Sequence, residues 1–257
     1  LLFFSCTTIM HFYYVFGKSN ILRMIENARQ YRYNYRMKYF VFSIDDGTIY
    51  DKKTIEIFNR FGIRATFNLN SGLQDFVWYN EGRPVERLKL WENREIYANH
   101  EVASHSLTHP HLTMCPDYIV EDEVKSDISN LSQIFEREIV TFAFPFEDFD
   151  DRCIDIIRWS TNVRCIRTSK LDESFSFPVD RYHINITTWQ IDVALELVDK
   201  FIKDDKAELF VFVAHSYDFE FGNSFSKLEE LCKIVTSHDD IKIITMSELA
   251  KKIEERQ

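Results

Sequence analysis

Glycine and proline are scarce in this sequence. Its 257 residues include six glycines and five prolines, while 45% of all residues are hydrophobic. Collagen-like repeats and low-complexity disordered chains are built from far larger shares of these two residues, so both classes are excluded. The length and the apolar content instead fit one globular domain, or one domain with an appendage.

The sequence also lacks an excess of positive charge. Lysine and arginine number 31 against 41 aspartates and glutamates, which gives a formal net charge of -10 at pH 7. Non-specific binding to nucleic acid or anionic lipid depends on a basic balance of charge. We therefore expect no nucleic-acid partner.

No pair of cysteines has the Cys-x-x-Cys spacing. The five cysteines are an odd number and lie far apart in the sequence. Neither a disulfide scaffold nor a thiolate zinc site is expected from this pattern. Reduced thiols fit a reducing compartment, so the cytoplasm is the expected location. If a leader is missing from the N-terminus, an exported or membrane-attached protein is expected instead.

The first 36 residues differ from the rest in charge and hydropathy. They open with an apolar run, LLFFSCTTIMHFYYVF, which is shorter than the roughly 20 residues that span a bilayer. Basic residues follow this run instead of preceding it, unlike the order in a signal peptide. We expect no stable membrane span, a peripheral or non-native extension over 1–36, and a folded domain over 37–257.

From residue 38 onward, short β-branched and aromatic runs alternate with amphipathic stretches of helical period. This alternation predicts an α/β fold with a parallel sheet. The predicted strands are 38–45, 64–69, 101–104, 140–144, 163–168, 181–186, 209–214 and 241–245. The predicted helices are 52–61, 116–137, 151–160, 189–203, 226–237 and 247–255. Ser247 is the predicted N-cap of the last helix.

Seven or eight β/α units suit either a barrel or an open doubly wound sheet. The sequence contains neither a Gly-x-Gly-x-x-Gly motif nor a phosphate-binding loop. A nucleotide-binding sheet is therefore the poorer choice. In a barrel, the loops that follow the carboxyl ends of the strands carry the chemistry.

Polar residues with metal-binding chemistry follow two of the predicted strands. Asp45 and Asp46 end the first strand, where an Asp-Gly turn is the simpler interpretation. His105 and His109 follow a later strand, and their spacing of four residues can bring both imidazoles to one side. Catalytic zinc takes about three protein ligands. Two histidines and either aspartate would supply them, so we predict a metal site.

A third histidine follows a strongly apolar predicted strand. His215 comes directly after the run FVFVA, where a buried strand would normally reach a turn residue. Its ordinary pKa of about 6.5 makes histidine suitable as a general acid near neutral pH. His215 is therefore a candidate general acid, and a hydrogen-bonded core histidine is the alternative.

Together these motifs resemble the polysaccharide deacetylases of carbohydrate esterase family 4, the nodulation-factor deacetylase homology domain. The family's first motif, usually Thr-Phe-Asp-Asp-Gly, is SIDDG at 43–47 in this chain. The second motif, His-Ser/Thr-x-x-His, is HSLTH at 105–109 and is followed by Pro110. The order and spacing of the motifs match across residues 38–250, so the resemblance covers most of the chain.

The resemblance implies a distorted (β/α) barrel of about seven units over 37–257. It also implies a divalent metal, usually zinc, held by Asp46, His105 and His109. Asp45 would be the general base, and His215 would protonate the departing amine. A backbone N–H near Phe146 would help to stabilise the oxyanion. The implied reaction removes an N-acetyl group from an amino sugar or polysaccharide and releases acetate.

The third motif departs from the family pattern. It often reads Arg-x-Pro-Tyr, whereas this chain has AFPF at 143–146, with Ala143 in place of the arginine. We predict that Arg167 contacts Asp45 instead, with Arg164 and Arg181 as alternatives. The acidic partner of His215 stays open among Asp180, Asp192 and Asp218.

Sugar binding is expected from aromatic and amide side chains on the same face of the barrel. The leading candidates are Phe146, Asn70, Trp189 and Tyr217, and the others are Trp78, Tyr79, Trp91 and Asn68. Ordinary packing or a turn explains each of them equally well. Two other functions also stay open: hydrolysis of another non-peptide carbon–nitrogen bond at the same metal, and a catalytically silent carbohydrate-binding relative.

Overall fold

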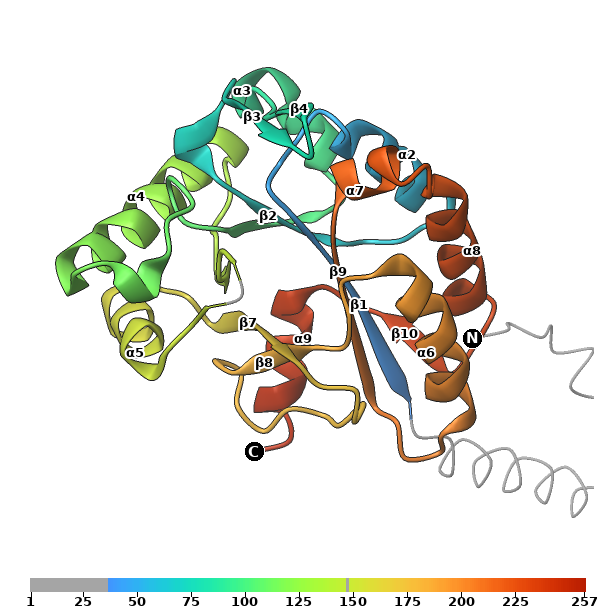
Figure 1. Cartoon of the computed structure of the whole chain (residues 1–257). Helices are drawn as coiled ribbons and strands as arrows, with labels where there is room; N and C mark the ends of the chain where they lie inside the picture. The colour runs from blue at the N-terminus through green and yellow to red at the C-terminus, as the bar shows by residue number, and fades with distance from the viewer. Residues whose placement is uncertain (1–36, 147) are drawn as a thin grey trace, which may run out of the picture. The chain divides into compact units, whose positions relative to one another are not determined.

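A computed structural model of the chain describes residues 37–146 and 148–257 (Figure 1). Residues 38–257 form one compact unit. The predicted extension over 1–36 lies outside the described residues, so that prediction and the domain boundary that depends on it stay predictions.

Parallel strands form the centre of this unit. Within the described residues, one eight-stranded sheet contains β1 (Lys38–Asp45), β2 (Thr66–Leu69), β5 (Glu101–Ser104), β6 (Thr141–Ala143), β7 (Cys165–Leu171), β8 (Ile184–Ile186), β9 (Leu209–His215) and β10 (Ile241–Ile243). One edge of β1 pairs with β9, and β2 and β10 share its other edge. A parallel β-bridge between Thr188 and Phe212 places the segment that follows β8 beside β9. The sheet therefore nearly closes into a barrel of seven strands, with β10 beside β1, and the predicted fold class is confirmed.

Helices cover the outside of the strands. They are α2 (Asp51–Arg60), α4 (Asp117–Phe135), α5 (Asp151–Ser160), α6 (Ile191–Lys203), α8 (Phe225–Thr236) and α9 (Met246–Glu254). Figure 1 shows α2, α4, α5, α6 and α8 arranged around the ring of strands. Every predicted strand and helix is present, with ends that differ by up to three residues. None of the described helices has the length and apolar character that crossing a bilayer requires.

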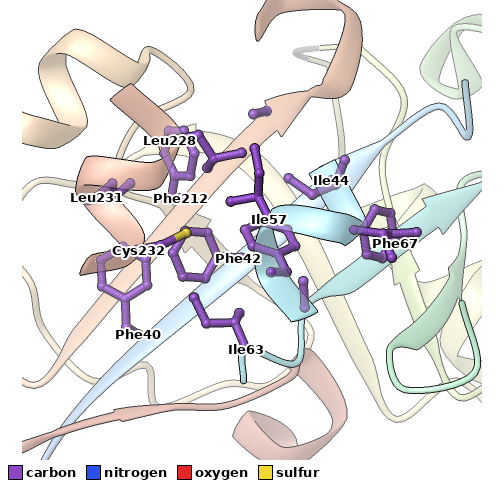
Figure 2. Close-up of a cluster of buried hydrophobic side chains, with 14 of the residues drawn as sticks. Phe40, Phe42, Ile44, Ile57, Ile63, Phe67, Phe212, Leu228, Leu231 and Cys232 are labelled. Atoms are coloured by element: carbon purple, nitrogen blue, oxygen red, sulfur yellow. The ribbon is translucent and has the colours of Figure 1, made fainter. Parts of the chain in front are cut away.

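The alternation of side chains along β1 separates two apolar clusters. Phe40 and Phe42 pack outward with Phe212 of β9 and with α8, as Figure 2 shows. Val41 belongs to the second cluster, with the inward-facing residues of β8 and β9. Because successive residues of a strand point to opposite faces, Asp45 shares the inward face of Val41. The strand pattern therefore directs the Asp45 carboxylate into the mouth of the barrel.

A hairpin before the third barrel strand was not predicted from the sequence. It consists of β3 (Val77–Asn80) and β4 (Arg83–Glu86), which pair antiparallel. Between them, Glu81 and Gly82 both have positive φ, of 49° and 76°. Two central residues of this kind make the tight hairpin turn that matches strand twist. The short helices α3 (Leu90–Asn93) and α7 (Ser216–Phe221) were also not predicted.

The predicted N-cap of the last helix is wrong. Thr245, not Ser247, caps α9, because its side chain accepts a hydrogen bond from the backbone N–H of Glu248. The Glu248 carboxylate in turn accepts from the backbone N–H of Thr245, at 2.9 Å. This reciprocal capping box satisfies two amide groups, whereas a cap at Ser247 would begin the helix two residues later.

The cysteines within the described residues are free thiols. These are Cys115, Cys153, Cys165 and Cys232, and the last three are buried. The cytoplasmic location inferred from the cysteine pattern stays a prediction.

Candidate metal and catalytic centre

A cavity of about 720 Å³ opens where the barrel strands end. Its lining includes the two adjacent aspartates and all three histidines that the sequence singled out, namely Asp45, Asp46, His105, His109 and His215. These residues come from the carboxyl ends of β1 and β9 and from the loop that follows β5. Because all barrel strands run parallel, side chains distant in the sequence meet at this end.

Asp46, His105 and His109 can each offer one ligand atom to a metal ion. Their candidate ligand atoms all lie within 4.8 Å of one another. His109 Nε2 is 3.5 Å from Asp46 Oδ1. Two imidazoles and one carboxylate are the donor set of a catalytic site that keeps open positions for water and substrate.

The protonation states of both histidines suit metal binding. His105 Nδ1 lies 2.8 Å from the backbone carbonyl oxygen of Ala143. A carbonyl only accepts, so Nδ1 carries the proton and the lone pair of Nε2 stays available. Burial lowers the pKa of His105 to about 3 and also lowers the pKa of His109. Both imidazoles are therefore neutral near pH 7, so the residues present fit a divalent cation.

Asp46 is held by an arginine that the sequence did not single out. Buried Arg87, directly after β4, places Nη2 3.0 Å from Asp46 Oδ1. Burial opposes ionisation of Asp46, but the Arg87 cation and the nearby charge of His215 hold its pKa below its usual range. No motif in the sequence indicates this contact, because it depends on the hairpin of β3 and β4.

Asp45 has two polar partners inside the barrel. Arg167 Nη2 donates to both of its carboxylate oxygens, at 2.8 and 2.6 Å, and both side chains are buried. Asn68 Nδ2 also donates to Asp45 Oδ1, at 2.6 Å. Arg167 thus makes the contact that we predicted. The alternatives lie elsewhere, since Arg164 pairs with Glu138 and Arg181 with Glu254.

His215 lies between Asp46 and a second carboxylate. Its Nδ1 is 2.9 Å from Asp218 Oδ2, and its Nε2 is 3.8 Å from Asp46 Oδ2. Burial opposes protonation, but the hydrogen bond to Asp218 and the charge of Asp46 raise the pKa of His215 to about 9. Asp218 is therefore the acidic partner. Of the other two candidates, Asp180 contacts His183 and Asp192 contacts Lys227.

The predicted sugar-binding aromatics divide between the cavity and the outer surface. Phe146, Trp189, Tyr217 and Trp78 line the cavity. Phe146 stacks on His111 with ring centroids 3.8 Å apart, and Trp78 meets Tyr217 edge-on. Tyr79 and Trp91 are exposed and lie outside the cavity lining.

The side chains of both amide candidates for substrate binding have partners within the protein. Asn70 is buried, and its Nδ2 donates to the backbone oxygens of His105 and Ser106. Asn68 is also buried, and it donates to Ser43 Oγ and Asp45. Neither residue lines the cavity. Both lie at the carboxyl end of β2. Their side-chain amides hydrogen-bond to residues at the ends of the neighbouring strands β1 and β5.

The family of the chain follows from a match to a protein-family model. Residues 32–160, which are half of the chain, match the model described as polysaccharide deacetylase. The chain belongs to the polysaccharide deacetylase family. No curated protein sequence matches the chain.

Solved structures of family 4 carbohydrate esterases have the same fold. The Xyl-CE4 domain of a multidomain xylanase from the hindgut metagenome of Trinervitermes trinervoides is 17% identical, with a TM-score of 0.58 over 84% of this chain and 91% of that one. A family 4 acetyl xylan esterase from Clostridium thermocellum, solved with a cobalt ion, is 12% identical, with a TM-score of 0.59 over 84% and 91%. A family 4 pseudoenzyme from Bacillus anthracis is 17% identical, with a TM-score of 0.55 over 84% and 66%.

Proposed function

We propose that this protein is a metal-dependent hydrolase that removes N-acetyl groups from an amino sugar or polysaccharide and releases acetate. The observation that carries the proposal is the pair Asp45 and Asp46. One carboxylate belongs to the three-residue group that could hold a metal ion, and its neighbour is held by Arg167 in the same cavity. Membership of the polysaccharide deacetylase family supports the same reaction.

Asp46, His105 and His109 would hold the metal. When bound, a divalent ion, preferably zinc, supplies Lewis-acid polarisation of the acetamide carbonyl and increases the acidity of water. Asp45 would accept the proton of the attacking water as general base. Arg167 fixes the orientation of Asp45, because it donates to both carboxylate oxygens.

His215 would then donate a proton to the departing amine. Its Nδ1 is occupied by Asp218, so Nε2 is the atom left to face the reacting groups. The backbone N–H near Phe146 is the proposed second donor to the oxyanion. Proton acceptance at Asp45 and donation at His215 complete one hydrolysis, with a free amino sugar and acetate as products.

Sugar rings would bind against the aromatic lining of the cavity. Trp189, Tyr217 and Phe146 present ring surfaces beside the polar residues. Aromatic faces pack well against the C–H groups of sugars, while the acetamide points toward Asp45 and His215. A cavity of about 720 Å³ is within the range that small ligands occupy.

The test is acetate release from a panel of N-acetylglucosamine oligomers and polymers. Metal-free protein is assayed before and after reconstitution with zinc, and the Asp45→Asn variant serves as the matched control. The proposal expects release that requires zinc and is lost in the control. Tight zinc binding with no acetate from any substrate would instead favour another carbon–nitrogen bond as the target.

A silent carbohydrate-binding relative is the second candidate. Ala143 replaces the family's usual arginine, and a family pseudoenzyme shares this fold. The contact between Arg167 and Asp45 argues against this candidate, because it supplies the cation that the substitution removes. Sugar binding without acetate release from that sugar would favour it.

A further inference from the structure

Arg87 and Asn70 form a buried polar pair beside the proposed metal site. They are 5% and 3% exposed. Arg87 Nη1 donates to the side-chain oxygen of Asn70. Neither residue is one of the metal ligands, and Asn70 does not line the cavity.

The pair connects the two loops that carry the ligands. Arg87 donates to the backbone oxygen and to the carboxylate of Asp46. Asn70 donates to the backbone oxygens of His105 and Ser106, the latter at 2.8 Å. The Ser106 hydroxyl then accepts from the backbone N–H of His109 at 3.1 Å. One chain of hydrogen bonds therefore reaches every proposed ligand.

These same loops hold unfavourable backbone conformations. Asp46, Ser106 and His109 have φ values of 85°, 64° and 56°. Non-glycine residues enter this region only where the surroundings over-determine the conformation. Two of these three residues are proposed ligands, so the direction of their side chains depends on a backbone that would relax without support.

The hairpin outside the barrel fixes Arg87 in this position. Ile49 N–H donates to Glu86 O at 3.0 Å, and Leu88 N–H donates to Gly47 O at 2.9 Å. The ring of Trp78 covers the guanidinium, with 4.8 Å from its carbon to the ring centroid. The residues on both sides of Arg87 are thus bonded to the loop that starts at Asp46.

We propose that Arg87 and Asn70 are positioning residues that hold both ligand loops in their left-handed conformations before the metal binds. The inference rests on the metal site of the proposed function. Substitution of partners that orient metal ligands typically costs about 10- to 100-fold in metal affinity. We expect a loss of that size in the zinc affinity of Arg87→Met and of Asn70→Ala.

Charge repulsion gives the opposite expectation for Arg87. A guanidinium beside Asp46 repels a bound cation, so its removal alone would tighten zinc binding. Arg87→Lys separates the two effects, because it keeps the charge but cannot reproduce the forked geometry. Under the positioning role, both Arg87 variants weaken zinc binding. Under a role of charge alone, Arg87→Met binds zinc more tightly and Arg87→Lys is unchanged.

Lys38→Met is the matched control for the loss of a buried cation. Lys38 is 5% exposed, and its Nζ donates to the backbone oxygens of Phe201 and Ile202 at 2.8 and 2.7 Å. It begins β1, at the end of the barrel opposite Asp45. We therefore expect Lys38→Met to lose about as much stability as Arg87→Met, without any effect on the ligand loops.

The experiment measures two properties of each folded variant. The first is the zinc dissociation constant, by competition with a chelator. The second is amide hydrogen exchange of the metal-free protein over residues 45–49 and 104–109. We expect weaker zinc binding and faster exchange in these segments for Arg87→Met, Arg87→Lys and Asn70→Ala. Lys38→Met should retain the values of the unsubstituted protein in both measurements.

Two results would overturn the inference: tighter or unchanged zinc binding in Arg87→Met, or exchange of the ligand loops at the original rate. If Arg87→Met does not fold, Arg87→Lys and Asn70→Ala decide the question. Failure of the unsubstituted protein to bind zinc would instead defeat the proposed metal site. The exchange measurement, which needs no metal, would still report whether the pair holds the loops.

Discussion

Arg167 of β7 and Asp45 of β1 form a buried ion pair in which Nη2 lies 2.8 and 2.6 Å from the two carboxylate oxygens. Ala143 of β6, in the position of the family's motif arginine, is the register partner of Arg167. Neighbouring residues in register on parallel strands lie at the same level of the barrel. The arginine that holds Asp45 therefore comes from β7 instead of β6, at the same level of the barrel as the family's motif arginine.

Arg167→Ala should lower kcat by about 100-fold or more, in the range of a lost acid–base function, because Asp45 loses the cation that orients it. KM should change much less, since the substrate is bound by the cavity walls. Steady-state kinetics with an N-acetylated sugar oligomer measure both constants. Arg164→Ala, which removes an exposed partner of Glu138, is the control and should behave like the original protein. Unchanged turnover in Arg167→Ala would eliminate the assignment.

The register of Ala143 and Arg167 allows a rescue experiment. The double variant with Ala143→Arg and Arg167→Ala returns the arginine to the position that the family's motif uses. We expect the double variant to recover part of the activity that Arg167→Ala loses. Activity no higher than in the single variant would show that register alone does not place a guanidinium against Asp45.

Trp189→Ala should raise KM for sugar oligomers by about 10-fold with little change in kcat, because one aromatic wall of the cavity is lost. Trp159→Ala is the matched control, since Trp159 is 75% exposed and lies outside the cavity. Kinetics against oligomers of increasing length measure the effect. Equal KM values for the two variants would exclude Trp189 from sugar binding.

His100 should make the fold sensitive to acid. Its Nδ1 accepts a hydrogen bond from Ala65 N–H, and burial, with the nearby charges of Arg64 and Arg137, lowers its pKa from 6.5 to about 4. Below pH 6.5 the unfolded chain gains a proton that the folded chain excludes. The contribution of neutral His100 to the unfolding free energy is therefore complete above pH 6.5 and is lost as the pH falls toward 4.

The matched variant for this effect is His100→Asn, whose side chain keeps an acceptor near the position of Nδ1. Between pH 7.5 and pH 5, the original protein should lose about 2 kcal/mol more unfolding free energy than the variant, from about 1.4 kcal/mol for each pH unit below the ordinary pKa. Urea unfolding at both pH values measures the difference. Equal losses would contradict a buried neutral His100.

The sequence predicted most of the barrel because its strands are buried on both faces and form continuous apolar runs. It predicted Asp46, His105 and His109 because each follows a strand at a fixed motif spacing. It did not predict Arg87, whose role depends on a short and largely exposed hairpin. It did not predict the protein partners of Asn70, because position at a strand end does not reveal whether an amide faces the cavity or the neighbouring backbone.

A zinc titration of the metal-free protein, followed by acetate release from an N-acetylglucosamine oligomer, tests the central claim most directly. The account predicts that activity rises with added zinc and levels off near one equivalent, at the site of Asp46, His105 and His109. The Asp45→Asn variant should bind the same equivalent of zinc without releasing acetate. Acetate release that is independent of zinc, or that persists in Asp45→Asn, would contradict the account.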